Sequence, residues 1–452
     1  MLSAAIMNQL SNRPFFLQSV RRSRSVPPHL PRVVIVGGGF GGLCAAQSMR
    51  NLPVQATLLD RRNFHLFQPL LYQVATGWLS PANIASTLRA VLRYQDNAQV
   101  FLAEVTDIDS ERRKVIFTGG EIAYDTLIVA SGSSHHYFGH DEWEALAPGL
   151  KSIEDATEMR RRIFSAFECA ERETDAAKIR AWLTFIIIGG GPTGVELAGA
   201  LADLANQTLT HDFRSIDPAD AQILLLEASD RILSTYPEEL STKAQGFLQG
   251  LGISVQPHTS VTELRPGEVV VQRDNRRELI ASHTVLWAAG VRASQLGKAL
   301  ARSAGAVLDR SGRVIVQGDF TIAQHPEIFV IGDLASYTPA SGKPLPGIAP
   351  VAQQAGRYVA KVIGSRIRGK TIPAQFTYRD RGSMAIVGRA TAIADLRGLH
   401  LAGFTAWLAW LFVHLMQLVE FENRVLVLVQ WGWFYFRRSR AARLITGDRF
   451  RL

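Results

Sequence analysis

The feature that most constrains the fold is a module that occurs twice. In it, a short apolar strand, a glycine-rich turn, a helix rich in small residues and a second strand lead to an acid. Residues 33–60 carry the first copy, with the turn GGGFGG and the acid Asp60, and residues 185–227 carry the second, with GGGPTG and Glu227. A glycine turn alone is a weak signal, but the flanking strand, helix and distant acid are the context that nucleotide binding requires. The sequence therefore predicts an α/β fold with two Rossmann-like dinucleotide-binding domains.

The three spaced glycines of each turn have different tasks. The first permits the tight passage from strand to helix, the second leaves room for a diphosphate, and the third lets the helix pack closely on the strand. The acid is placed to accept hydrogen bonds from a ribose. These residues are Gly37, Gly39, Gly42 and Asp60 in the first copy and Gly189, Gly191, Gly194 and Glu227 in the second.

The acid of the second module indicates which nucleotide binds there. A carboxylate such as Glu227 binds a free ribose 2′-hydroxyl and repels a 2′-phosphate. The next residues, Ala228 and Ser229, offer no arginine that would accommodate a phosphate. We therefore expect NADH rather than NADPH.

Length, cysteine content and charge exclude several classes of protein. The 452 residues, 47% of them hydrophobic, are enough for two or three domains. Cys44 and Cys169 are the only cysteines, and their separation excludes a disulfide framework and a structural zinc site. The net charge of +9 resides at the ends, because residues 1–31 hold four Arg and no acid while residues 437–452 hold six Arg and one Asp. A neutral body with basic ends favours an anionic membrane surface over nucleic acid.

Three further apolar strands end in small residues, which let the backbone approach a ligand. They end at Gly132, at Ala289 with Gly290, and at Gly332 with Asp333. A Pro- and Gly-rich loop at 344–347 leads into a helix near residue 349, whose free N–H groups face the space before it. Residues 151–180 predict a charged amphipathic helix that leads into the second module.

The C-terminal part is apolar and rich in tryptophan. Residues 399–419 are 21 residues without Asp, Glu, Lys or Arg, which is the length of a transmembrane helix. Several polar residues argue against a span, namely His400, Thr405, His414 and Gln417. Residues 425–436 are too short to cross a bilayer and are followed by the basic run RRSR at 437–440. We expect these helices to lie in the membrane interface, with a true span or a soluble dimer face as alternatives.

Taken together, the motifs are similar to those of the type II NADH:quinone dehydrogenases, single-subunit flavoenzymes that do not pump protons. The resemblance covers about residues 32–445 and rests on GGGFGG, LFQPLLYQVATG, ASGSSHHYFG, GGGPTGVELAGAL, FRSIDP, WAAGV, FVIGDLA and QWGWFYFRRSRAARLI. It implies FAD in the first module, NADH in the second, and a quinone of the lipid bilayer as acceptor.

The resemblance also implies roles for individual residues. Glu196 would lie near the nicotinamide and Gln354 near the quinone, as the candidate catalytic residues. Family members often carry AQxAxQ here, and in this chain Pro350 stands at the first glutamine while Gln354 retains the second. Besides the glycines and acids above, the candidate cofactor-binding residues are Phe40, Gly41, Arg61, Gly132, Gly332, Asp333 and Ala352 for FAD, and Pro192, Thr193, Ala289 and Gly290 for NADH.

In the expected organisation, the NADH domain is inserted into the sequence of the FAD domain. Residues 1–31 form a basic tail, 32–150 and 310–395 the FAD domain, 151–309 the NADH domain, and 396–452 the membrane-anchoring helices. We expect a homodimer on the cytoplasmic face of a bacterial inner membrane. The mitochondrial inner membrane is the alternative, because the tail also has the composition of a transit peptide.

Other functions share the two-nucleotide plan. A disulfide-type reductase needs a redox cysteine pair, and Cys44 has no partner nearby in the sequence. A ferredoxin-type reductase would have no use for the apolar C-terminal part, and an NADH-binding redox sensor would turn over slowly or not at all. The neighbouring histidines His135, His136 and His140 are expected to form a polar loop without a metal.

Overall fold

The first glycine module lies at the centre of a six-stranded sheet. The computed structural model describes residues 30–339, 342–437 and 442–446. The strand order is β20-β21-β9-β1-β2-β5, and all neighbours are parallel except β20 and β21. The strands are β1 (Arg32–Val36), β2 (Gln55–Asp60), β5 (Ala98–Leu102), β9 (Thr126–Val129), β20 (Thr321–Ile322) and β21 (His325–Val330). Since β21 follows the second module in sequence but pairs with β9, which precedes it, this sheet is built from two separate parts of the chain.

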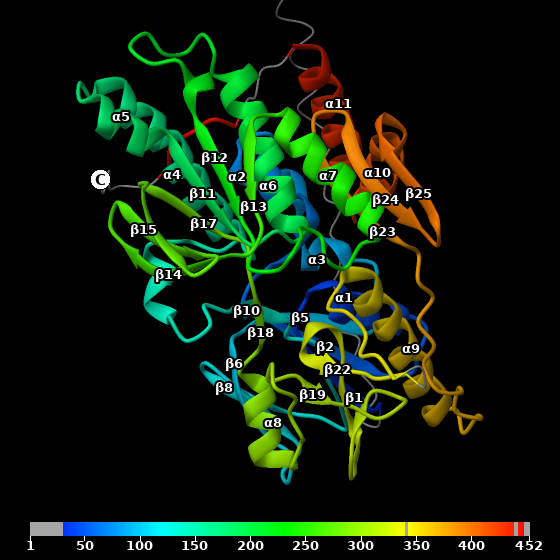
Figure 1. Ribbon diagram of the computed structural model, residues 1–452. Coiled ribbons are helices and arrows are strands. Elements are labelled where there is room, and N and C mark those ends of the chain that lie inside the picture. The colour runs from blue at the N-terminus through cyan, green and yellow to red at the C-terminus, as the bar shows by residue number, and fades with distance from the viewer. Residues whose placement is uncertain (1–29, 340–341, 438–441, 447–452) are drawn as a thin grey trace, which may run out of the picture. The chain divides into compact units, whose positions relative to one another are not determined.

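Two helices pack side by side against this sheet, α1 (Phe40–Ser48) and α9 (Ala349–Ile367) (Figure 1). Their apolar residues join those of β1 in one hydrophobic core. The two backbones approach closely, because a Cβ on Gly356 of α9 would lie 2.3 Å from the carbonyl oxygen of Gly41 of α1. The N-terminus of α9 is thereby fixed relative to the first glycine turn.

The second glycine module forms the centre of a four-stranded parallel sheet with the order β13-β12-β11-β17. Its strands are β11 (Thr184–Ile188), β12 (Gln222–Leu226), β13 (Ile253–Gln256) and β17 (Thr284–Trp287), and the helices of this part are α4 (Ile153–Arg172), α5 (Ala176–Leu183), α6 (Pro192–Asp203) and α7 (Glu238–Gly250). The expected helix over 151–180 is in fact two helices. The chain turns at Glu173, and Asp175 caps the start of α5 by accepting hydrogen bonds from two backbone N–H groups.

Smaller elements complete these two parts. The strands β10 (Ser133–His135) and β18 (Val291–Ala293) pair antiparallel, where the chain passes between the two large sheets. The others are β3 (Phe64–Leu66) with β4 (Ala85–Thr87), β6 (Val105–Asp109) with β7 (Lys114–Phe117) and β8 (Gly120–Ala123), β14 (Thr259–Arg265) with β15 (Glu268–Arg273) and β16 (Arg276–Ala281), β19 (Val314–Ile315) with β22 (Ala335–Ser336), and the helices α2 (Leu71–Ala75), α3 (Leu88–Val91) and α8 (Leu296–Ala304).

The C-terminal part begins with a three-stranded antiparallel sheet, β23 (Ser383–Gly388), β24 (Thr391–Leu396) and β25 (Leu399–Gly403). It packs on α6, where a Cβ on Gly199 would lie 1.9 Å from the carbonyl oxygen of Val387. Because this sheet continues across the expected boundary between residues 395 and 396, we propose that the C-terminal domain starts near residue 380.

The long apolar stretch at 399–419 is not one helix. Its start is β25, and only α10 (Phe404–Gln417) is helical before the chain breaks and α11 (Phe421–Arg437) begins. Helix α10 packs on β24 and β25, and α11 lies beside α10 (Figure 1). Among the described residues, no helix has both the length and the apolar character needed to cross a bilayer. Residues 438–440 of the basic run at 437–440, and residues 1–29 of the expected tail at 1–31, lie outside the described residues.

Candidate active site

The first glycine turn connects the end of β1 to the start of α1. Gly37 has a φ of +103°, and a Cβ on it would lie 2.4 Å from the carbonyl oxygen of Ala130. A Cβ on Gly42 would lie 1.9 Å from the carbonyl oxygen of Gly37. Both positions require glycine for the turn itself. By contrast, a Cβ on Gly39 would meet no atom within 4 Å, so the turn is open on this side.

Asp60 holds this turn from the end of β2. Its Oδ2 accepts a hydrogen bond from the backbone N of Gly38 at 2.6 Å, and its Oδ1 accepts one from the backbone N of Arg62 at 2.7 Å. No described side chain caps the start of α1, so its first N–H groups are available to a ligand. An open surface with free N–H groups beside a fixed carboxylate fits the diphosphate and ribose of a dinucleotide.

The second turn repeats this geometry between β11 and α6. Gly189 has a φ of +106°, and a Cβ on Gly194 would lie 1.9 Å from its carbonyl oxygen. A Cβ on Gly191 would meet no atom within 4 Å. The backbone N of Gly190 donates to Oε2 of Glu227 at 2.6 Å, as Gly38 does to Asp60. The chain thus contains two equivalent cradles for a dinucleotide.

The loop around Glu227 suits a ribose without a 2′-phosphate. Its Oε1 accepts a hydrogen bond from the backbone N of Ser229 at 2.8 Å. Arg231, the arginine of this loop, donates to the backbone oxygens of Ser234 and Tyr236 at 3.0 Å each. Because this guanidinium is engaged by carbonyl groups, it is not directed at a phosphate beside Glu227.

The remaining candidate cofactor residues lie around the two turns. Phe40 and Gly41 begin α1, Pro192 and Thr193 begin α6, and Ala352 lies in the first turn of α9, where its carbonyl oxygen would be 3.4 Å from a Cβ on Gly41. Ala289 and Gly290 follow β17, and a Cβ on Gly189 would lie 2.8 Å from the Cα of Ala289. Arg61 is exposed. The structure therefore brings these residues together in the two groups that the motifs indicate.

A polar cluster surrounds Asp333 at the end of β21. Ser133 Oγ donates to Oδ2 of Asp333 at 2.7 Å, and Lys151 Nζ donates to Ser133 Oγ at 3.0 Å. Lys151 Nζ is 3.8 Å from the same carboxylate oxygen. Gly132 and Gly332, which adjoin Ser133 and Asp333 in sequence, both have positive φ, at +69° and +71°. Neither Ser133 nor Lys151 stands out in the sequence, because each belongs to this cluster only through folding.

Glu196 lies in α6, and its carboxyl is directed at β23. Its Oε1 accepts a hydrogen bond from the backbone N of Ile386 at 3.4 Å. Burial raises the pKa of Glu196 to about 8, although the hydrogen bond from Ile386 opposes this shift. The carboxyl is therefore protonated at neutral pH, and it lies against a residue that lines the pocket described next.

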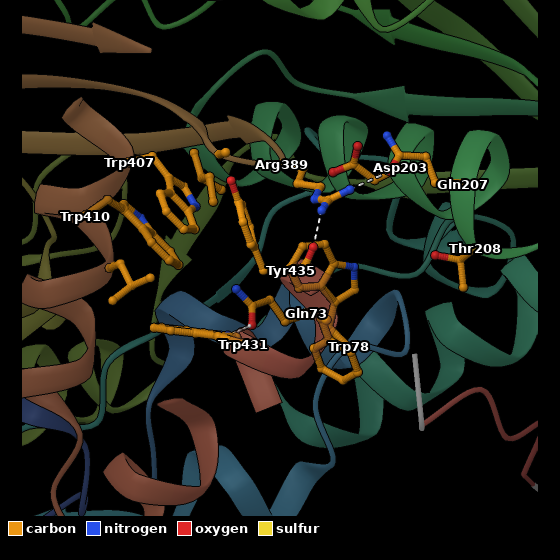
Figure 2. A pocket seen from close by; sticks show the side chains of 14 residues that line it. Gln73, Trp78, Asp203, Gln207, Thr208, Arg389, Trp407, Trp410, Trp431 and Tyr435 are labelled. Atoms are coloured by element: carbon orange, nitrogen blue, oxygen red, sulfur yellow. Dashed lines mark hydrogen bonds between the residues drawn. The ribbon is translucent and has the colours of Figure 1, made fainter. Parts of the chain in front are cut away.

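A pocket lies between the end of α6, β23 with the turn that follows it, α10 and α11, next to the segment around Gln73 (Figure 2). It has about 590 Å³ of empty volume, part of which is open to solvent. Aromatic side chains form much of its wall, with one guanidinium among them. The residues that define it best are Gln73, Ile386, Arg389, Trp407, Trp410, Trp431 and Tyr435. Apolar walls with a few polar groups are typical of a small-molecule site.

Polar groups in the pocket are held in fixed positions. Arg389 donates to the side-chain oxygen of Gln207 at 3.1 Å and to the backbone oxygen of Tyr435, and its guanidinium lies 5.0 Å from the centre of the Tyr435 ring (Figure 2). Trp431 Nε1 donates to Oε1 of Gln73 at 2.8 Å. Helix α11 is thereby joined to both the β23–β24 turn and the segment at Gln73.

Gln354, the second candidate catalytic residue, is engaged by the backbone. Its Nε2 donates to the carbonyl oxygen of Arg379 at 3.0 Å, and its Oε1 accepts from the N of Arg379 at 3.0 Å. This pair of hydrogen bonds holds the segment before β23 on α9. Gln354 therefore has a structural task that is independent of any contact with a quinone.

The C-terminal tryptophans divide between the interior and the surface. Trp410 and Trp431 are buried, whereas Trp433 is 57% exposed. The exposed apolar residues are instead spaced four apart along α10, at Phe404, Leu408, Phe412 and Met416, and similarly along α11, at Phe421, Val425, Val429 and Trp433. Each helix thus has one apolar stripe facing outward and another facing the pocket, a division that its composition does not reveal.

The histidines at 135 and 140 each contact an acid, and both cysteines are free. His135 contacts Asp155 at 3.0 Å, while His140 contacts Glu142 at 3.1 Å and stacks on Trp143. Within the described ranges, no group of three or more His, Cys, Asp or Glu side chains is arranged for a metal ion. Cys44 in α1 and Cys169 in α4 are both free thiols, so the chain has no redox disulfide.

Comparisons with known proteins identify the family. Residues 31–356 match the pyridine nucleotide-disulphide oxidoreductase family, and residues 381–438 match the NDH2 C-terminal domain. The type II NADH:quinone oxidoreductases NdhA and Ndh of Mycobacterium tuberculosis are 44% and 43% identical to this chain. The two alignments cover 92% and 93% of this chain and 90% and 91% of the relatives.

Solved structures show the same fold. NDH2 from Plasmodium falciparum in complex with NADH has a TM-score of 0.83 at 19% identity, over 93% of this chain and 100% of that one. The sulfide:quinone oxidoreductase of Aquifex aeolicus has a TM-score of 0.69 at 17% identity, over 90% and 96% of the two chains. The relatives match over nine-tenths of the chain, and the two family models match its first and last parts. This chain therefore belongs to the type II NADH:quinone oxidoreductases.

Proposed function

We propose that the chain passes two electrons from NADH through FAD to a quinone, without pumping protons. The observation that carries this proposal is the pair of equivalent glycine cradles next to an aromatic pocket made by the C-terminal helices. A bound FAD would supply the two-electron chemistry that links hydride transfer from the nicotinamide to reduction of the quinone. The work of the protein is to place the three molecules and to supply a proton.

The first cradle is the proposed site of FAD. The open side at Gly39 and the free N–H groups of α1 suit its diphosphate, and Asp60 suits its ribose. Asp333, with Ser133 and Lys151, is proposed to hold the ribityl and phosphate region. The second cradle, with Gly191 and Glu227, is the proposed site of NADH.

The pocket between α6 and the C-terminal helices is the proposed site of the quinone head. Its aromatic walls suit a flat ring, and Arg389 provides a cation that a quinone oxygen can approach. Glu196 lies behind Ile386 at the wall of this pocket and is neutral at pH 7. A neutral carboxyl can donate one of the protons that reduction of a quinone consumes.

Replacing Glu196 by Gln tests this role. We expect quinone reduction at pH 7 to fall by roughly a hundredfold, the usual effect of losing a general acid. The wild-type rate should also decline as the pH rises through about 8, where Glu196 ionises, and the variant should lack this decline. Reduction of ferricyanide consumes no proton and should be unchanged. Equal losses with both acceptors would contradict a role in proton transfer.

The same substitution has a pH-dependent effect on stability. The carboxyl ordinarily ionises near 4.5 but in the folded protein near 8, so the folded state binds more protons between these values. The wild type therefore loses stability as the pH rises through this window. The Gln variant lacks this loss. In thermal unfolding, the stability of the variant relative to the wild type should therefore increase as the pH rises.

Replacing Glu227 by Gln tests the choice of nucleotide. The amide keeps an acceptor oxygen for the turn but loses the charge that favours a ribose hydroxyl and repels a phosphate. We expect the KM for NADH to rise about tenfold and the KM for NADPH to fall. Steady-state kinetics with both nucleotides measures the ratio, and the FAD content serves as the control. An unchanged ratio would show that this carboxylate does not select the nucleotide.

We propose that the exposed apolar stripes of α10 and α11 rest in a membrane interface, as a monotopic anchor. Phe412 and Trp433 are more than half exposed and lie on the same helices that line the pocket. A quinone can then enter from the bilayer without crossing water. We further propose a homodimer on the cytoplasmic face of a bacterial inner membrane, with no nucleic-acid partner.

The direct test is steady-state NADH oxidation by the purified protein with ubiquinone and menaquinone analogues. We expect NADH-dependent reduction of at least one quinone and little activity with NADPH. Activity with ferricyanide alone would contradict the quinone assignment, and equal use of NADPH would contradict the assignment of the second cradle.

A further inference from the structure

Gly38 in the first turn has hydrogen-bond partners for both its backbone N–H and its carbonyl group, which belong to the two successive peptide groups on either side of its Cα. Its N–H donates to Oδ2 of Asp60 at 2.6 Å, and its carbonyl oxygen lies 2.9 Å from Nδ1 of His65 in β3. A carbonyl oxygen only accepts hydrogen bonds, so Nδ1 carries the proton and Nε2 is the bare nitrogen of the neutral ring. The segment from the end of β2 to β3 therefore fixes the orientation of both peptide groups that adjoin the Cα of Gly38.

The second turn reaches the same result by different means. There the N–H of Gly190 donates to Glu227 at 2.6 Å, and its carbonyl oxygen accepts a hydrogen bond from the backbone N of Leu233 at 2.8 Å. Every residue except proline can supply that backbone N–H, whereas the bond to Gly38 depends on a particular side chain. The two cradles are otherwise equivalent and differ in the group that binds this carbonyl oxygen, a side chain in the first and a backbone N–H in the second.

The surroundings of His65 favour this single arrangement. The residue is 3% exposed, and its ring meets the ring of Phe40 edge to face, with centroids 5.0 Å apart and an interplanar angle of 87°. Phe40 is the first residue of α1, so the ring touches both the turn and the start of the helix. Burial lowers the pKa of His65, which keeps the ring neutral near pH 7.

We propose that His65 is a positioning residue for FAD: by holding the Gly38 carbonyl through Nδ1, it keeps the first turn in the shape that receives the FAD diphosphate. The inference rests on the proposed FAD site of this turn. It predicts that FAD affinity depends on one side-chain nitrogen, while the NADH cradle is insensitive to the same change.

Three substitutions separate the hydrogen bond from simple packing. In His65→Asn the amide nitrogen takes the place of Nδ1, so the bond to Gly38 can be kept. In His65→Gln the amide nitrogen takes the place of Nε2 and points elsewhere, and His65→Leu removes both donors. His283→Leu controls for the loss of an imidazole elsewhere in the protein: His283 is exposed, stacks on Trp182 and lies just before β17, at the end of the parallel strands opposite the second turn.

The measurement is FAD binding to flavin-free protein, followed by flavin fluorescence, with thermal unfolding of the flavin-free forms as the check on folding. We expect His65→Leu and His65→Gln to weaken FAD binding by about tenfold to a hundredfold, as for a buried carbonyl that loses its partner. His65→Asn should stay within a few-fold of the wild type, and His283→Leu should match it.

Equal weakening in all three variants would show that the ring acts by packing and would overturn the proposal, as would wild-type affinity in His65→Leu. Since binding of FAD is measured without a quinone, this result is independent of the proposed function. A protein that binds FAD normally but reduces no quinone would contradict the function and leave the role of His65 intact.

Discussion

Replacing Gly191 by Val is expected to abolish reduction by NADH while the protein keeps its fold and its FAD. The position has extended backbone and open space, since a Cβ meets no atom within 4 Å. The added methyl groups therefore cost the protein little but occupy the space that we propose for the NADH diphosphate. Losing several charge-assisted hydrogen bonds should raise the KM for NADH by at least about a hundredfold.

A glycine with equally open surroundings, but outside both turns, serves as the control for this test. Gly246 in α7 also has nothing within 4 Å of its Cβ, yet it lies on no cradle, so Gly246→Val should leave the kinetics unchanged. The rate of flavin bleaching by NADH measures the effect, and the flavin absorbance of the purified protein shows that FAD is retained. Bleaching of Gly191→Val at the wild-type rate would mean that NADH binds elsewhere.

Replacing Phe412, Val429 and Trp433 together by Ser is expected to release the protein from lipid vesicles. These three side chains are between 57% and 64% exposed and project from α10 and α11 away from the pocket. Burying one such side chain fully contributes about 1.5–3 kcal/mol, so three partly buried ones should change the partition coefficient by roughly a hundredfold or more.

A matched variant controls for the loss of exposed apolar surface as such. Leu279, Val307 and Ile372 are similarly exposed but lie outside the C-terminal helices, and replacing them by Ser should leave vesicle binding unchanged. Sedimentation with anionic vesicles measures both variants. Ferricyanide reduction should persist in each. If the triple variant of α10 and α11 still sediments like the wild type, these helices are not the anchor.

The two cradles were predictable from the sequence because their determinants are local. Gly37, Gly42 and Asp60 act within one strand–turn–helix–strand unit, and the second unit repeats the pattern at Gly189. The antiparallel addition of β20 and the break between α4 and α5 were not predicted, since each depends on contacts between distant segments or on a single cap.

The pocket was not predictable because its walls come from separate parts of the chain. Gln73 lies in the motif LFQPLLYQVATG, but it and Arg389 belong to segments that meet only in the folded protein. The tryptophans indicated a membrane interface, but the composition does not show that Trp410 and Trp431 are buried while Trp433 is exposed. The spacing of four between the exposed residues of α10 was visible in the sequence and could have distinguished the two stripes.

The surroundings of Glu196 depend on the fold, and its role stays a prediction. The motif placed it near the start of the second helix, and the packing of β23 on α6 brings its carboxyl to Ile386. That packing requires Gly199, where any side chain would collide with the carbonyl of Val387. The acid therefore connects the NADH module to the C-terminal pocket.

The most direct test of the relay is an anaerobic stopped-flow experiment with two mixing steps. NADH is first mixed with the purified protein, and a quinone analogue is added after the flavin absorbance has bleached. Two cradles and an acceptor pocket on one chain predict rapid bleaching by NADH, slow bleaching by NADPH, and full recovery of the flavin absorbance with the quinone. Flavin that stays reduced with the quinone but recovers with ferricyanide would contradict this account.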